Sequence, residues 1–164
     1  MAINSPTDLF LYELSVTYDA ENKINQMRGE AAGMVRNENL AQELRNEQSK
    51  GQQKIANLDS CFQALGASRQ DIPCLTVDGM RAEFQQFTNQ QPSPDVLDMC
   101  VVGKELKTSS MMSGTYQGLV DKATLMGQTS CAQFLQSNLV QVDEAKGRVQ
   151  RLGHDISQQA LAPA

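Results

Sequence analysis

Apolar residues recur along most of the chain at the three- and four-residue spacing of an α-helix. In the first such stretch, Phe10, Leu14 and Ile24 fall on one helical face. Glu21 falls on the same face, which places a carboxylate among apolar neighbours. A buried carboxylate without a partner is unfavourable, so this pattern predicts that Glu21 either binds a ligand or is paired with another polar group.

Caps and breakers divide the chain into four long helices and one short helix. Ser5 followed by Pro6 is typical of a helix start, and the same pair recurs at Ser93. Gly66 is typical of a residue that ends a helix. The predicted helices cover residues 6–35, 38–65, 77–90, 94–126 and, after a cap at Thr129 or Ser130, a last helix that ends at Gly153.

The order of these elements predicts the fold class. The second and third long helices are separated by a long connection that carries the short helix, as in a ferritin-like four-helix bundle. We expect one all-α domain over residues 1–164, with its core in residues 6–152 and a partly frayed tail at 153–164. Bundles of this kind hold metal ions between facing helices, so the inward polar residues decide the chemistry.

Composition agrees with helices and excludes several classes of function. Aromatic residues make up 5% of the 164 residues and Trp is absent, which favours helices over sheet. The net charge is −5 and no basic cluster occurs, so we expect no binding to nucleic acid or to an anionic membrane. No apolar run approaches the roughly 20 residues of a membrane span, and the start lacks signal-peptide features. We therefore expect a cytoplasmic protein.

Other motifs give no indication of catalysis. The chain has no glycine-rich phosphate loop, and its one histidine, His154, lies near the tail, where a solvated surface position is typical. The pair Met111–Met112 is typical of adaptable core filler or of a dimer surface, and we expect a homodimer. The cysteines form no C-x-x-C pair and are expected to be small buried apolar residues; they are Cys61, Cys74, Cys100 and Cys131.

Several short motifs follow one another along the chain. They are Asp8-Leu9-Phe10, Glu13-Leu14, Tyr18, Ala20 and Glu21; Leu58, Phe62, Leu65 and Gly66; Cys74 with Val77-Asp78-Gly79-Met80; and Tyr116, Leu119, Leu125 and Gly127. Over residues 7–152, their order and spacing resemble those of the YciF-type bacterial stress proteins, a ferritin-like family. The resemblance implies a stress-linked role and a possible di-iron type of site, built from inward Glu and His side chains of all four helices.

The resemblance carries few metal ligands over to this chain. Glu21 matches the carboxylate of the first helix, but the family's His and Glu of the second helix fall on Glu47 and Lys50. A two-metal site needs several carboxylate or imidazole ligands, so we expect a degenerate site. In the last two helices the matching positions are Ser109, Ser110, Met112, Val140, Gln141 and Val142.

Helical geometry predicts a polar centre of the bundle, for which alternatives remain open. In the first, Arg28 or Lys146 pairs with Glu21 and Glu47, no metal or cofactor is bound, and the protein is a non-catalytic structural or interaction protein. In the second, iron or another divalent metal binds Glu21 and Glu47, as in an oxidase or iron-handling protein. A third is a small-ligand pocket. The predicted polar centre comprises Glu21, Arg28, Glu47, Gln48, Ser109, Ser110, Ser113, Gln117 and Lys146.

Overall fold

The computed structural model describes residues 3–162, and this part of the chain folds into five α-helices without strands. The all-α, ferritin-like prediction is confirmed. Residues 1–2 and 163–164 of the predicted domain lie outside the described residues. The helices are α1 (Pro6–Ala32), α2 (Glu38–Leu65), the short α3 (Leu75–Thr88), α4 (Pro94–Leu125) and α5 (Thr129–Ala160).

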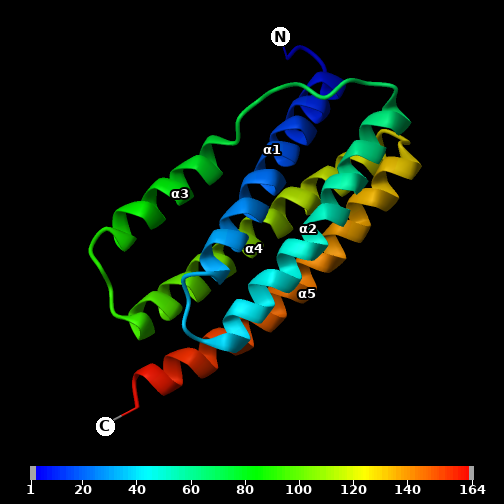
Figure 1. The fold of residues 1–164 in the computed structure, drawn as a ribbon. Helices are drawn as coiled ribbons and strands as arrows, with labels where there is room; N and C mark the ends of the chain where they lie inside the picture. Colours follow the sequence, from blue (N-terminus) through cyan, green and yellow to red (C-terminus); the bar gives the residue numbers. More distant parts are fainter. Residues whose placement is uncertain (1–2, 163–164) are drawn as a thin grey trace.

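The four long helices form a closed bundle (Figure 1). The antiparallel neighbours α1 and α2 pack side by side, as do α4 and α5, and the ring closes through contacts of α2 with α5 and of α1 with α4. The chain leaves α2 at one end of the bundle and enters α4 at the other, so the connection runs its full length. The short α3 lies in this connection, outside the four long helices and against α1.

Two apolar clusters fill the interior of the bundle. One surrounds Leu14, Leu58 and Leu135, and the other surrounds Leu40 and Val149. Full burial of each such side chain contributes about 1.5–3 kcal/mol to folding. Apart from Asp98 near the start of α4, the buried charged residues lie along the inner stretches of the same helices, between the two apolar clusters.

The last helix differs most from the sequence prediction. Its N-cap is Gln128, so neither Thr129 nor Ser130 is the cap, and the helix continues through Gly153 to residue 160. A Cβ atom at Gly153 would lie 2.4 Å from Cγ1 of Val102 in α4. The prediction that this glycine ends the helix is therefore wrong, because the missing side chain serves close packing of α5 on α4. The other helix boundaries agree within a few residues.

A buried carboxylate of α4 holds the turn between α1 and α2. The two side-chain oxygens of Asp98 accept hydrogen bonds from the backbone N–H groups of Arg36 and Asn37, each at 2.9 Å. Asn37 in turn caps α2, since its Oδ1 accepts the N–H of Leu40 at 3.0 Å. Asp98 thus satisfies backbone donors of the turn and has a structural role.

Candidate functional site

Glu21 lies in the centre of the bundle with 1% of its surface exposed. Its Oε1 accepts a hydrogen bond from the hydroxyl of Tyr116 at 2.7 Å, and its Oε2 lies 3.6 Å from Nζ of Lys54. Lys54 is also 1% exposed, so the ion pair is shielded from water. Neither Arg28 nor Lys146 forms the expected ion pair with Glu21, although the charge of Glu21 helps to raise the pKa of Arg28. The partners come instead from α2 and α4, whose inward faces lie beside that of α1.

A chain of hydrogen bonds extends from this pair across the bundle. Nδ2 of Asn138 in α5 donates to the Tyr116 hydroxyl at 3.2 Å and to the backbone oxygen of Lys54 at 3.0 Å. Oδ1 of Asn138 accepts from Nδ2 of Asn57 at 2.7 Å. Burial, together with the charge of Glu21 and the hydrogen bond to it, raises the pKa of Tyr116 well above its usual value, although Asn138 opposes this. The hydroxyl therefore stays protonated and remains a donor to Glu21.

A second buried ion pair joins α1 to α4. Nε of Arg28 donates to Oε1 of Glu105 at 2.9 Å, and Nη2 of Arg28 reaches the same oxygen. Burial opposes the charged form of Arg28, but the charge of Glu105, its hydrogen bond with Arg28, and the charges of Glu21 and Glu47 outweigh this effect, so the pKa of Arg28 is raised. Both side chains are nearly fully buried.

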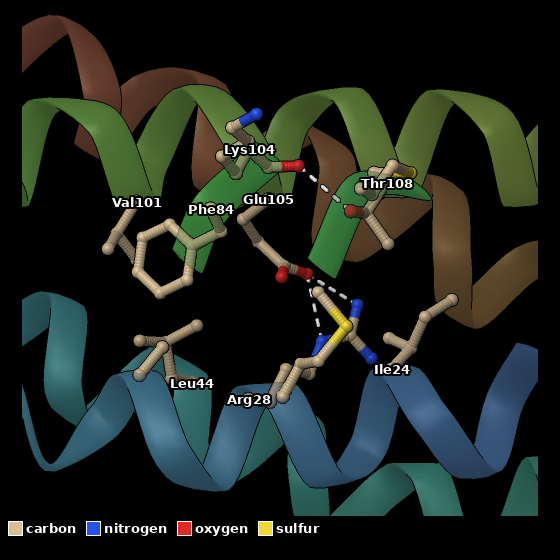
Figure 2. Close-up of a pocket in the computed structure, with 11 residues that line it drawn as sticks. Ile24, Arg28, Leu44, Phe84, Val101, Lys104, Glu105 and Thr108 are labelled. Atoms are coloured by element: carbon tan, nitrogen blue, oxygen red, sulfur yellow. Dashed lines mark hydrogen bonds and ion pairs between the residues drawn. The ribbon is translucent and has the colours of Figure 1, made fainter. Parts of the chain in front are cut away.

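The Arg28–Glu105 pair borders a small cavity, shown in Figure 2. Phe84 of α3 approaches from one side, and Leu44 and Val101 add to its mainly apolar wall. The cavity measures about 50 Å³, far below the roughly 300–1,000 Å³ typical of small-molecule sites. It cannot enclose a ligand of that size without movement of α3.

Glu47 is the third buried carboxylate at the centre, and it also faces cations. Its Oε1 accepts from Nη2 of Arg148 at 2.8 Å and lies 3.1 Å from Nζ of Lys50. Nε of Arg148 donates to Glu43 at 2.9 Å, so the guanidinium bridges two carboxylates of α2. The charge of Glu47 is thus opposed from the neighbouring helix α5 and from its own helix.

The predicted polar centre is correct for some residues of α4 and wrong for others. Ser109 is buried, whereas Ser113 is half-buried and donates to Asp143 at 2.6 Å. The prediction that Ser110 and Gln117 line the interior is wrong, since both are exposed. Each follows a buried residue by one position, and this step rotates the side chain by about 100° toward solvent.

Two other residues of the predicted polar centre, one on α2 and one on α5, are only half-buried. Gln48 is half-buried beside Gly29, where a Cβ atom would lie 2.3 Å from its Nε2. Lys146 is half-buried on α5. Sequence reasoning missed Lys54 and Glu105. The spacing offered a signal for Lys54, which lies seven residues after Glu47 and therefore shares its helical face.

The residues present do not fit a two-metal centre. Such centres take carboxylate and His ligands from facing helices, but Glu21 and Glu47 each face a cationic side chain. Within residues 3–162, no group of three or more His, Cys, Asp or Glu side chains is arranged to hold a metal ion. His154 lies exposed on α5, away from the buried carboxylates.

Some buried polar atoms of the centre have no hydrogen-bond partner among the protein atoms of residues 3–162. They come from three helices and include donors as well as acceptors, a combination that ordered water can satisfy. At the centre they are Asn25 Oδ1, Arg28 Nη1, Glu47 Oε2 and Ser109 Oγ.

Comparison with known proteins identifies similar sequences and folds. The family described as a domain of unknown function (DUF892) matches residues 5–162. The Escherichia coli stress protein YciF has a similar crystal structure, with a TM-score of 0.91 and 18% identity over 95% of this chain and 99% of that chain. YcfI of Rhodopseudomonas palustris, described as a candidate structural protein, gives 0.86 and 25% identity over 90% and 94% of the two chains.

A protein of Xanthomonas campestris pv. campestris has the same fold with a TM-score of 0.77 and 16% identity, over 96% of each chain. Curated proteins gave no significant match. No helix in the described part of the chain is both long and apolar enough to cross a membrane.

Proposed function

The chain belongs to the DUF892 family and is a YciF-type helical protein, and from this premise we propose a non-catalytic structural or interaction role with a metal-free interior. One observation carries the proposal: each buried carboxylate at the centre faces a cation. A divalent metal would have to displace these cations to reach the carboxylates. The pairs are Glu21 with Lys54, Glu105 with Arg28, and Glu47 with Arg148 and Lys50.

The same residues connect the helices to one another. Glu21 and Lys54 join α1 to α2, and Arg28 with Glu105 joins α1 to α4. A catalytic acid or base must come within hydrogen-bond reach of its substrate. Glu21 and Lys54 are sealed from solvent inside the bundle, and the cavity beside Arg28 and Glu105 is too small for a small-molecule substrate. The arrangement is therefore suited to holding helices together.

The similar proteins, the net charge and the cysteines support inferences about the biological role, the partners and the compartment of this protein. YciF is described as a stress protein, and we extend a stress-linked role to this chain. A net charge of −5 supports neither nucleic acid nor an anionic membrane as a partner. The four cysteines are free thiols, as is usual in a reducing compartment, which supports a cytoplasmic location.

Metal content tests the proposal directly. We expect the protein to carry no stoichiometric iron, either as purified or after anaerobic loading with ferrous iron and desalting. A chelator should leave the melting temperature unchanged, because no bound metal stabilises the folded state. Elemental analysis and thermal melting provide the measurements.

The iron-handling alternative gives the opposite result. Stoichiometric iron that is lost in Glu21→Ala and Glu47→Ala, but kept in the control Glu38→Ala, would overturn the proposal. Glu38 is a suitable control because it is an exposed glutamate at the start of α2.

We further propose that the chain forms a homodimer through the face between α3 and α4. Leu75 is 74% exposed there, and it borders a shallow hollow that is also lined by Met80 and Met111. Of the predicted methionine pair, Met112 is buried in the core, so only Met111 can contribute to this face. Burying an exposed leucine on association contributes about 1.5–3 kcal/mol.

Sedimentation equilibrium of two charge variants tests this dimer. We expect Leu75→Glu to raise the dimer dissociation constant more than about 10-fold, which corresponds to about 1.4 kcal/mol. Leu125→Glu is the matched control, because Leu125 is 80% exposed at the distant end of α4. A monomeric wild-type protein, or equal weakening by both variants, would contradict the proposed face.

A further inference from the structure

Two cysteines that are far apart in sequence meet at one end of the bundle. Cys61 lies near the end of α2, and Cys131 is the third residue of α5. Both are buried, and the thiol of Cys61 donates to the backbone oxygen of Cys131 at 3.5 Å. The two side chains therefore occupy the same part of the α2–α5 interface, while Cys74 and Cys100 lie on other elements.

The two thiols differ in reactivity. Cys131 lies in the first turn of a 32-residue helix whose N-cap, Gln128, makes no side-chain capping bond. Free N–H groups and the helix dipole at such a position stabilise a thiolate. The interaction with the Cys61 thiol lowers the pKa of the Cys131 thiol, although burial opposes this, whereas the same interaction and burial raise the pKa of Cys61. Cys131 is thus the better nucleophile of the pair.

We propose that Cys61 and Cys131 form a modification site, at which a hydroperoxide produces a disulfide between α2 and α5. The Cys131 thiolate attacks one peroxide oxygen and the O–O bond breaks, which leaves a sulfenic acid on Cys131; the departing alkoxide, or hydroxide from hydrogen peroxide, takes a proton from solvent and leaves as alcohol or water. The Cys61 thiol then attacks the sulfenic sulfur, loses its proton and releases water. Two thiols are oxidised and one hydroperoxide is reduced.

The positions of both residues near helix ends give the oxidant access. Terminal helical turns open locally at a much lower free energy than central ones. Gly66 ends α2 in the left-handed conformation shortly after Cys61, and a non-helical segment follows it. Local opening of these turns exposes the thiols without unfolding the polar centre, and it lets the two sulfur atoms approach bonding distance.

Peptide mapping of the full-length protein tests the site without any mutation. Trypsin cleaves after Lys and Arg, so it places Cys61 in residues 55–69 and Cys131 in residues 123–146, with the other two cysteines on separate peptides. The reduced, folded protein is treated with hydrogen peroxide, alkylated, denatured and digested without reductant. We expect a linked pair of these two peptides, lighter than their sum by two hydrogen atoms and separated by dithiothreitol.

The link should also raise the melting temperature by about 5–10 °C, because it closes a long loop in the unfolded chain. Two results would overturn the proposal: alkylation of both peptides after oxidation of the folded protein, or linkage of Cys61 or Cys131 mainly to Cys74 or Cys100.

Variants test the order of the two steps. In Cys61→Ala, a dimedone-type reagent should trap a sulfenic acid on Cys131, because the second thiol is missing. In Cys131→Ala, trapping on Cys61 should be slower, because Cys61 is buried near the C-terminal end of α2, where the helix dipole disfavours a thiolate. The double variant Cys74→Ala/Cys100→Ala is the matched control and should keep the full yield of linked peptide. Equal trapping on Cys61 and Cys131 would contradict the assignment of Cys131 as nucleophile.

Discussion

Lys54→Met is expected to lower the free energy of unfolding by about 3–5 kcal/mol, because removing one member of a buried ion pair leaves the other charge uncompensated. Methionine has nearly the length of lysine, so the change removes charge with little loss of packing. Glu21 would keep its hydrogen bond from Tyr116, at 2.7 Å, and the longer-range attraction of Arg28, in an interior where Glu21 and Tyr116 are 1% exposed or less. Urea denaturation monitored by circular dichroism measures the loss.

The same helix provides a matched control for this variant. Lys50→Met removes a lysine whose side chain is 43% exposed and whose partner Glu47 retains Arg148. A loss below about 1 kcal/mol is expected there, as for exposed ion pairs. The double variant Glu21→Gln/Lys54→Met should recover much of the loss, since a neutral amide removes the buried charge. Equal losses in Lys54→Met and Lys50→Met would refute an energetically important Glu21–Lys54 pair.

Arg28→Met is the second variant with a large expected effect, a decrease of about 3–5 kcal/mol in the free energy of unfolding. It leaves the Glu105 carboxylate beside the apolar cavity wall without the guanidinium that holds it (Figure 2). Arg28→Lys should lose less, because an ammonium restores the charge but not the two-donor contact of the planar guanidinium. Denaturant titrations of the three proteins would rank them as wild type, Arg28→Lys and Arg28→Met in decreasing stability.

Arg45→Met is the control for this series. Arg45 is an exposed arginine of α2, so its loss should change stability by no more than about 0.5 kcal/mol. If Arg28→Lys were as unstable as Arg28→Met, charge would contribute nothing at this position and the pairing with Glu105 would not explain the burial of Arg28.

Most of the fold could be predicted from the sequence because its signals are local. Ser5 and Pro6 start α1, and Gly66 ends α2 in the left-handed conformation that glycine favours. The prediction that the last helix ends at Gly153 was wrong, because a glycine that ends a helix cannot be distinguished by sequence from one that permits close packing. Only the position of Val102, on another helix, distinguishes them.

The candidate site was less predictable because its pairs join different helices. The periodicity of α1 predicted the burial of Glu21, which the structure bears out. Its partner depends on how α2 is rotated and at what height it lies beside α1, and no local pattern encodes either quantity. Arg28 was a reasonable partner from its seven-residue spacing, but Glu105 of α4 reaches it instead. A lysine such as Lys54 is rarely fully buried, so its inward position was missed.

The hydrogen bonds of Asn138 also determine how far the helices can slide along one another. In an apolar interior, one leucine can replace another after a shift of a single turn, about 5.4 Å. The same shift would separate Asn138 from the Tyr116 hydroxyl, the Lys54 backbone oxygen and Asn57, and each buried group left unpaired would cost about 1–3 kcal/mol. A few amide and hydroxyl groups thus select one alignment of α2, α4 and α5 from several that hydrophobic packing alone would leave nearly equal in energy.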